Sequence, residues 1–331
     1  MGKHMKTVRW GILGTGGIAR KFAEALSLLP DAQIVAVGSR TKAAADDFGN
    51  TWKIPRRYGS YLELANDPET DVIYIATIHT LHRENCLDCL EAGKAVLCEK
   101  PFTINAAQAA EVISLARQKK IFLMEAMWTR YFPVFGKVRE LLAADALGEI
   151  RLVQADFAFR PAYDPKGRLY NPELGGGALM DIGVYPVSLA SMIFGESPRR
   201  ILSSAVVGRT GVDEQAAVIF EYPGGRQASL TFSFQYASPL EANIIGTEGR
   251  IRIESPWWYP RALTIVRPGR EDERISLPYL GNGYTHEAVE VMECLRERKT
   301  ESGRMPLEET LRIMQTLDAI RSDWGVKYPG D

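Results

Sequence analysis

The chain has 331 residues, of which 46% are hydrophobic and 24% charged, and its formal net charge is −1. This length exceeds one typical core and predicts two domains of ordinary globular composition. The near-neutral charge argues against nucleic acid and anionic membranes as partners. No apolar run approaches the roughly 20 residues of a membrane span, so we expect no membrane segment.

Strand-like and helix-like segments alternate over the first third of the chain. Apolar runs with the length of buried strands occupy residues 8–14, 33–39, 72–77, 95–98 and 121–127. Helical spacing of apolar residues follows at 18–29, 82–93 and 105–120. This alternation predicts a doubly wound parallel sheet covered on both faces, a Rossmann domain over residues 5–127. We exclude the preceding residues MGKH from the fold.

The pattern changes near Trp128. Two runs predict β-hairpins, one over 216–236 that turns at Pro223–Gly225 and one over 243–254 that turns near Gly249. Helical segments are expected at 134–143, 285–298 and 306–324. Short connections favour antiparallel pairing, so residues 128–330 should form an α+β domain with a mostly antiparallel, locally connected sheet.

Four cysteines, Cys86, Cys89, Cys98 and Cys294, suggest no disulfide framework and favour a reducing, cytoplasmic location. On a helix, His82, Cys86 and Cys89 would share one face. A metal site would need a further ligand group nearby, whereas thiols often pack as small buried apolar groups. We therefore expect no metal.

A glycine-rich turn lies between the first strand and the first helix. Gly14, Gly16 and Gly17, followed by Ile18, fit the dinucleotide-binding pattern, in which backbone approaches the pyrophosphate at a helix N-terminus. An ordinary glycine-rich turn is the alternative. The strand–turn–helix context favours dinucleotide binding.

The end of the second strand indicates which dinucleotide is bound. NAD sites usually carry an acid there, about 20 residues after the glycines, to bond the ribose 2′-hydroxyl. This chain has Ser39, Arg40 and Lys42 instead, which suit a 2′-phosphate and favour NADP(H). A solvated basic turn is the alternative.

Polar residues also follow the fourth and fifth strands, at the edge where ligands bind in such sheets. Glu99 and Lys100 end one strand and precede a proline, which favours an extended Lys100. A surface ion pair would explain these two residues equally well. Thr77 and His79 end the other strand and are expected near the nicotinamide, and His82 opens the following helix as a further candidate cofactor contact, although each histidine alone is more often structural.

The segment GGGALMDIGVYP, residues 175–186, places Asp181 and Tyr185 four apart, on one face of a predicted helix. We expect its leading glycines to keep side chains away from a substrate cleft. Gly183 costs about 1 kcal/mol in a helix, which suggests close packing by a substrate or the other domain.

These segments, together with ATIHTLH, CEKP and MEAMWTRYFP, occur in one order. The chain resembles the glucose-fructose oxidoreductase/inositol dehydrogenase (Gfo/Idh/MocA) family over nearly its whole length, most of all the dimeric dihydrodiol dehydrogenase branch, which also oxidises D-xylose with NADP. The resemblance implies an open-faced second sheet and a homodimer formed through it. It assigns catalytic roles to Lys100 and Tyr185, and it places Trp128 and Arg130 near the nicotinamide and substrate. Many relatives have His where this chain has Tyr185, which weakens inositol as the substrate.

We hypothesise that Tyr185 is the acid/base in hydride transfer between nicotinamide and a sugar or vicinal diol. A phenol has an ordinary pKa of about 10, and the Lys100 ammonium would favour its ionised form and stabilise charge on the substrate oxygen. Asp181 would orient the substrate or Lys100. One alternative is a reductase of 1,5-anhydrofructose or another dicarbonyl sugar. A second is a non-catalytic, NADP-sensing regulatory protein.

Overall fold

The computed structural model describes residues 6–331, and both the MGKH segment and Met5 lie outside this range. The chain forms two compact units. The first comprises residues up to Trp128 together with Leu280–Leu311, and the second comprises Thr129–Tyr279 together with Arg312–Asp331. The division is therefore not a single cut near residue 127, because a late segment returns to the first unit.

The first unit contains a six-stranded sheet whose strands are all parallel, in the order β3-β2-β1-β4-β5-β6. Its strands are β1 (Val8–Leu13), β2 (Ala32–Gly38), β3 (Arg56–Tyr58), β4 (Val72–Ile75), β5 (Ala95–Glu99) and β6 (Leu123–Ala126). Strands β4, β5 and β6 are buried along their whole length. The predicted doubly wound Rossmann sheet is confirmed.

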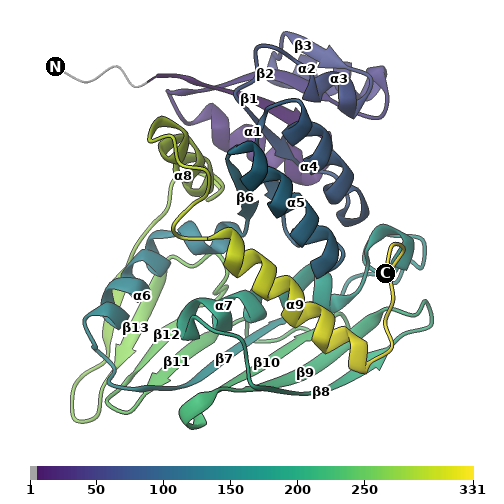
Figure 1. Ribbon diagram of the computed structural model, residues 1–331. Coiled ribbons are helices and arrows are strands. Elements are labelled where there is room, and N and C mark those ends of the chain that lie inside the picture. The colour runs from purple at the N-terminus through teal and green to yellow at the C-terminus, as the bar shows by residue number, and fades with distance from the viewer. Residues whose placement is uncertain (1–5) are drawn as a thin grey trace, which may run out of the picture. The chain divides into compact units, whose positions relative to one another are not determined.

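Helices cover both faces of this sheet (Figure 1). They are α1 (Gly17–Ser27), α2 (Lys42–Trp52), α3 (Tyr61–Ala65), α4 (His82–Glu91), α5 (Ala106–Lys119) and α8 (Thr285–Arg296). Helix α1 contacts α8, whereas α4 contacts α3 and α5. The late helix α8 is thus a structural part of the dinucleotide-binding unit.

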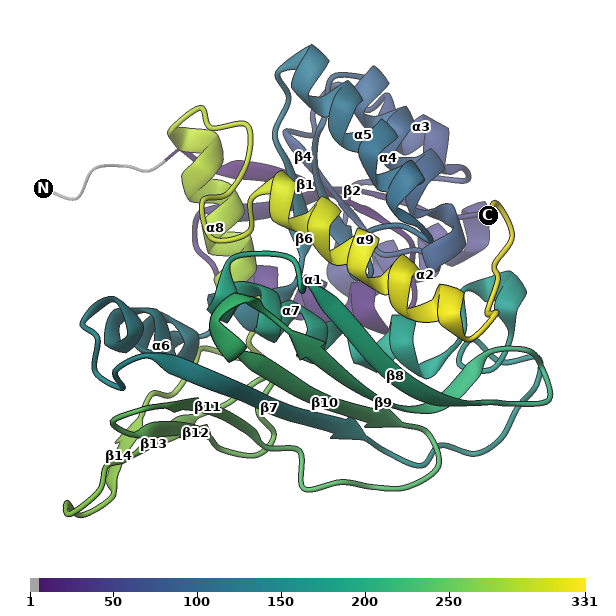
Figure 2. The same ribbon diagram turned by 60° about the horizontal axis from the view of Figure 1, so that its bottom comes forward.

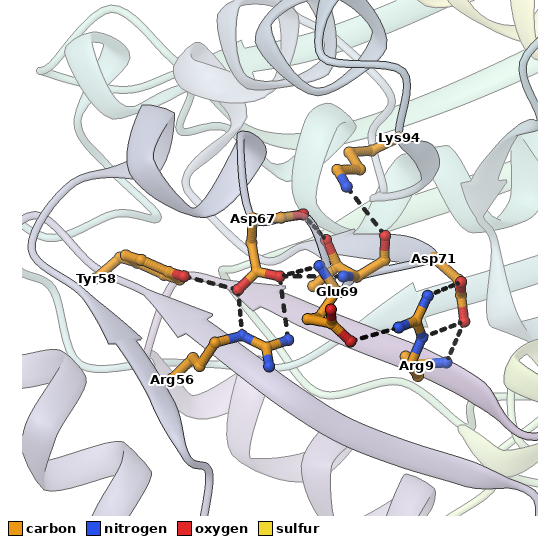
Figure 3. A network of polar contacts seen from close by, with 8 residues as sticks. Arg9, Arg56, Tyr58, Asp67, Glu69, Asp71 and Lys94 are labelled. Carbon is orange, nitrogen blue, oxygen red and sulfur yellow. Dashed lines mark hydrogen bonds and ion pairs between the residues drawn. The ribbon is translucent and has the colours of Figure 1, made fainter.

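The loop before β4 is fixed by a polar network around Asp67, shown in Figure 3. The buried carboxylate of Asp67 accepts hydrogen bonds from Arg56 and from the Tyr58 hydroxyl, at 2.8 Å for the latter. It also accepts from the backbone amides of Glu69 and Thr70, at 2.7 and 3.1 Å. Strand β3 is therefore joined to the loop that leads into β4.

The second unit is built on an eight-stranded sheet in the order β14-β13-β12-β11-β7-β10-β9-β8, part of which faces the viewer in Figure 2. Its strands are β7 (Ile150–Ala158), β8 (Arg200–Val207), β9 (Asp213–Glu221), β10 (Gln227–Ser233), β11 (Ala242–Gly246), β12 (Arg250–Ile253), β13 (Ala262–Val266) and β14 (Glu273–Ser276). Both predicted hairpins, β9–β10 and β11–β12, are present and antiparallel.

The expectation of a locally connected sheet is wrong at its centre. Strand β7 pairs parallel with β10 and antiparallel with β11, both far downstream in the chain. Parallel neighbours need a long crossover connection, and here it contains α7 (Val184–Phe194). Helix α7 lies on one face of the sheet in both views and packs on β7 and β10. The unit also includes α6 (Pro133–Ala143) and most of α9 (Leu307–Asp323).

The other face of this sheet is open, as predicted. Along β8 and β9, Leu202, Val206 and Ile219 are 38%, 51% and 41% exposed. Within the described residues, the stretch Pro172–Phe194 is long and apolar enough to cross a membrane, but 89% of its apolar window is buried inside the protein. That burial is typical of a core helix.

Candidate active site

Predicted site residues of the first unit gather at one edge of its sheet. Gly14 follows β1, Ser39 follows β2, Thr77 follows β4, Lys100 follows β5 and Trp128 follows β6. All these strands are parallel, so their carboxyl ends share one edge, where ligands of open α/β sheets bind.

The glycine turn has room for a ligand. Gly14 has φ of +106°, and a Cβ there would lie 2.8 Å from the Ala76 carbonyl oxygen, so its glycine is required by the fold. At Gly16 and Gly17 an added Cβ would meet no protein atom within 4 Å. Gly16 also starts α1 without a side-chain cap, leaving first-turn amides available to a phosphate. The backbone from Gly16 to Ile18 therefore fits a dinucleotide pyrophosphate.

The turn after β2 carries hydroxyl and basic groups and no acid. Ser39 is buried and its Oγ lies 3.2 Å from Thr15 Oγ1. Arg40 is exposed, and Lys42 forms an ion pair with Asp46 one helical turn on. The predicted selectivity for a 2′-phosphate stays a prediction.

His82 opens α4 as predicted and is completely buried. Its Nδ1 lies 2.9 Å from the Pro101 carbonyl oxygen and its Nε2 lies 3.2 Å from that of Thr77. Burial lowers the pKa of His82 below its ordinary value. A neutral ring has one N–H, so it donates to one of these two carbonyls at a time while lying between the ends of β4 and β5. The neighbouring His79 is also buried, with the two ring centroids 5.8 Å apart.

The backbone of Lys100 is held by the buried Glu99, which precedes it. Glu99 accepts from the Tyr74 hydroxyl through one oxygen and from the Lys100 backbone amide, at 3.1 Å, through the other. Burial, and then the charge of Glu99, raise the pKa of Tyr74 well above its ordinary value. The same two causes raise the pKa of Glu287, on α8, well above its ordinary value. Glu99 thus orders the backbone that presents Lys100.

Trp128 and Arg130 have different surroundings. The Trp128 ring stacks on Tyr284, with centroids 4.1 Å apart and planes inclined by 8°. Arg130 is 3% exposed and belongs to the second unit, where its guanidinium donates to the Ser188 carbonyl at 2.8 Å and to the Ser188 hydroxyl. Ser188 lies one turn beyond Tyr185 on α7, so Arg130 positions that helix. Its cofactor contact stays a prediction.

Asp181 and Tyr185 are 7% and 6% exposed. Asp181 Oδ1 accepts from Arg168 Nη1 at 2.7 Å, and the Arg168 side chain is 42% exposed. The Tyr185 ring packs beside Phe157, at 5.4 Å between centroids. Asp181 is therefore ion-paired by Arg168, from the loop between β7 and α7, a partner that the sequence did not reveal.

The helix over GGGALMDIGVYP begins with a π-helical turn, Leu179–Gly183, before α7. The wider turn makes the alignment of Asp181 with Tyr185 looser than an α-helix predicts. Pro186 gives a local cause, since it has no amide hydrogen to donate to the Ile182 carbonyl four residues earlier.

Two expectations for the glycines are wrong. A Cβ at Gly183 would lie 3.0 Å from the Phe232 ring, so the close neighbour is a strand of the same unit. A Cβ at Gly176 would lie 2.9 Å from backbone atoms of Arg168 and Asn171. The fold itself excludes side chains at these positions.

All four cysteines are buried, unpaired thiols. Among residues 6–331, the structure shows no group of three or more His, Cys, Asp or Glu side chains placed to hold a metal ion.

Known families match both units. A model described as the oxidoreductase family with an NAD-binding Rossmann fold matches residues 8–127, and a GFO/IDH/MocA C-terminal domain model matches residues 135–252. A Xenopus laevis protein named trans-1,2-dihydrobenzene-1,2-diol dehydrogenase is 42% identical, over 97% of this chain and 99% of its own. The chain belongs to the Gfo/Idh/MocA oxidoreductase family.

Other known proteins are similar over comparable lengths. The human protein of the same name is 39% identical over 98% of this chain and 99% of its own. A solved 3-ketoreductase from Actinomadura kijaniata, in complex with NADP and TDP-benzene, has a TM-score of 0.85 and 27% identity over 96% and 98% of the two chains. An aldose-aldose oxidoreductase from Caulobacter crescentus, at 23% identity over 96% and 97%, shares the fold with a TM-score of 0.87. The protein is thus an oxidoreductase with a nicotinamide-binding domain.

Proposed function

We propose that this Gfo/Idh/MocA protein is an NADP(H)-dependent dehydrogenase acting on a secondary alcohol of a trans-dihydrodiol or a sugar such as D-xylose. The observation that carries the proposal is similarity of about 40% along the whole length of both chains to proteins named trans-1,2-dihydrobenzene-1,2-diol dehydrogenase. Both the nucleotide-binding and the substrate-binding parts of those relatives therefore have counterparts here.

Three features support NADP(H) as the cofactor. The turn after β2 has no acid to bond a ribose 2′-hydroxyl and offers Ser39, Arg40 and Lys42 to a phosphate. The open space at Gly16 and Gly17 fits the pyrophosphate. The Actinomadura kijaniata relative is described in complex with NADP. Thr77 and His79 are proposed to border the nicotinamide.

A nicotinamide bound there would supply the hydride chemistry, as acceptor in oxidation of the alcohol and as donor in reduction. Tyr185 takes the hydroxyl proton on oxidation and gives it back on reduction. The Lys100 ammonium favours the phenolate and stabilises negative charge on the substrate oxygen. Arg168 holds the Asp181 carboxylate, and Arg130 holds the helix that carries Tyr185. The Actinomadura kijaniata enzyme has been crystallised with a lysine changed to alanine or glutamate and with a tyrosine changed to phenylalanine.

Reduction of a carbonyl sugar is the second candidate, favoured by the 3-ketoreductase relative. The wild-type protein should be tested with NADP+ or NAD+ on trans-dihydrodiols and D-xylose, and with NADPH on 1,5-anhydrofructose. We expect turnover of the diol or xylose and tighter binding of NADPH than of NADH. Equal dissociation constants would reject the cofactor assignment, and turnover of the dicarbonyl sugar alone would reject the substrate class. A complete lack of hydride transfer would support an NADP-sensing protein.

We also propose a homodimer that buries the open face of the second sheet, because Leu202, Val206 and Ile219 are exposed there. Light scattering should give twice the chain mass. A reducing, cytoplasmic location is proposed from the four unpaired thiols.

A further inference from the structure

A buried carboxyl group lies at the start of the segment that carries Tyr185. Asp213 begins β9, and its Oδ2 accepts a hydrogen bond from the Leu179 backbone amide at 2.6 Å. Its side chain is fully buried, and its Oδ1 has no hydrogen-bond partner within the described chain. Asp213 Oδ2 therefore holds the first amide of the π-helical turn, while Asp213 Oδ1 makes no hydrogen bond within the described residues.

The C-terminal tail supplies a second group to the same place. The Tyr328 hydroxyl donates to the Gly176 carbonyl oxygen at 2.6 Å. The tail is fixed in turn, since Asp331 accepts from the Tyr328 amide at 2.8 Å and from Arg321 Nη2 at 2.7 Å. These contacts of the C-terminal residues therefore hold the Tyr328 ring against Gly176.

The two side chains converge on Gly177. A Cβ at this residue would lie 2.6 Å from Asp213 Oδ1 and 2.8 Å from the Tyr328 hydroxyl oxygen. Gly177 also has φ of +110°, which favours glycine. Asp213 Oδ1 and the Tyr328 hydroxyl oxygen thus both face the position that a Gly177 side chain would take, and both oxygens are buried.

We propose that Asp213 and Tyr328 are positioning residues that hold the 177–185 segment, and through it Tyr185, in the geometry for proton transfer. The proposal rests on the proposed function. It assigns them two hydrogen-bonding states. In one, ionised Asp213 holds the Leu179 amide with a full charge. In the other, Asp213 is protonated and would donate from Oδ1 toward the Tyr328 oxygen, which faces the same side of Gly177 and whose own hydrogen is directed to Gly176.

The switch between these states falls in the neutral range. Burial raises the pKa of Asp213 to about 7, opposed by backbone hydrogen bonds from Leu179 and Asp213 itself, and the charge of the adjacent Glu214 raises it further. On the tail, Tyr328 faces Asp213, Arg321 and Asp331, and burial followed by the charge of Asp213 raises its pKa well above the ordinary value. The phenol therefore stays neutral, and its oxygen can accept a hydrogen bond from protonated Asp213.

Stability gives a reason to regard this carboxyl as functional. A carboxyl whose pKa is raised by folding binds its proton more tightly in the folded state, so stability declines as pH rises from about 4 to about 7. A neutral asparagine could cap the same amide without that cost. Groups that oppose stability are common where activity depends on them.

The test is the pH dependence of kcat and KM between about pH 6 and pH 8.5 for the wild type, Asp213→Asn and Tyr328→Phe. Asn imitates the protonated state, so Asp213→Asn should lose the inflection near pH 7 and keep the lower kcat of the acid limb, with NADPH binding unchanged. We expect a loss on the order of tenfold to a hundredfold at pH 8, as for a misplaced catalytic group. Tyr328→Phe, which removes the acceptor, should move the inflection to lower pH. An unchanged profile in both folded variants would overturn the proposal.

A second measurement does not require turnover. Carbon-13 NMR of labelled aspartate should show one carboxyl titrating near pH 7 that is missing in Asp213→Asn and shifted to lower pH in Tyr328→Phe. Its absence from the wild type would overturn the proposal, whereas an inactive wild type that shows it would reject only the proposed function. Asp71→Asn is the matched control. Burial alone would raise the pKa of Asp71, but hydrogen bonds from the Arg9 side chain and amide lower it, so this variant should leave both readouts unchanged.

Discussion

At the scale of single residues, the glycines of GGGALMDIGVYP have causes inside the fold. Gly177 faces Asp213 and Tyr328, and Gly183 lies against the Phe232 ring. The sequence singles out this stretch, because an acid and a phenol inside an apolar helix are unusual. The sequence could not show what these glycines contact. The neighbours of Gly177 lie 36 or more residues away in the chain, and the neighbour of Gly183 lies on β10.

Gly183→Ala should lower the free energy of unfolding by about 1–3 kcal/mol, the usual effect of an extra methyl group in a packed core, reduced by the better helix propensity of alanine. The cause would be the Phe232 ring 3.0 Å from the new Cβ. Denaturant unfolding of a double-mutant cycle with Phe232→Leu checks this. In the Phe232→Leu background, Gly183→Ala should lower the free energy of unfolding by less, or not at all. Additive effects of the two substitutions would argue against the contact.

Some residues of the proposed site could be identified from the sequence and others could not. Lys100 could be located because a buried strand ends on it, and Tyr185 because it breaks an apolar pattern. Arg168 and Ser188 carry no such signal, although they hold Asp181 and Arg130. Their roles depend on which distant elements meet, and periodicity does not report that.

At the scale of elements, local signals identified the buried parallel strands and the two hairpins β9–β10 and β11–β12. They did not identify β3, β8, β13 or β14, although β8, β13 and β14 pair with neighbours in the chain. Strand β7 was missed although its burial alternates, since both of its partners lie far downstream. The π-helical turn was missed because i, i+4 spacing presumes an α-helix.

The Asp67 network of Figure 3 should govern the stability of the β3–β4 connection. Asp67→Ala removes a buried partner of Arg56 and should cost about 3 kcal/mol of unfolding free energy at neutral pH. Burial alone would raise the pKa of Asp67, but its hydrogen bonds from Arg56 and Tyr58 lower it overall. This stabilisation is therefore fully present above about pH 4 and is lost as pH falls through the lower, folded-state pKa.

Urea unfolding of Asp67→Ala and wild type at pH 7 and at acid pH measures this. Glu69→Ala is the matched control, because Glu69 forms an exposed ion pair with Arg9 and its loss should change stability by less than about 1 kcal/mol. Equal costs for the two substitutions would contradict the assigned role of burial.

At the scale of the whole molecule, the chain is divided between two units that each hold part of the proposed machinery. Lys100 belongs to the unit that binds the dinucleotide, and Tyr185 belongs to the unit built on the open sheet. Two domains were predictable from length and from the change of pattern near Trp128. The return of Leu280–Leu311 to the first unit was not, because helical periodicity does not tell which sheet a helix covers.

The central claim is that Tyr185 carries the proton in NADP-linked oxidation of an alcohol. Its most direct test is the steady-state kcat of Tyr185→Phe with NADP+ and the best substrate of the wild type, beside Tyr222→Phe, a buried tyrosine at the β9–β10 turn. The account predicts a loss of about 10² or more in Tyr185→Phe, with NADPH binding preserved and Tyr222→Phe fully active. Turnover near that of the wild type in Tyr185→Phe would contradict it.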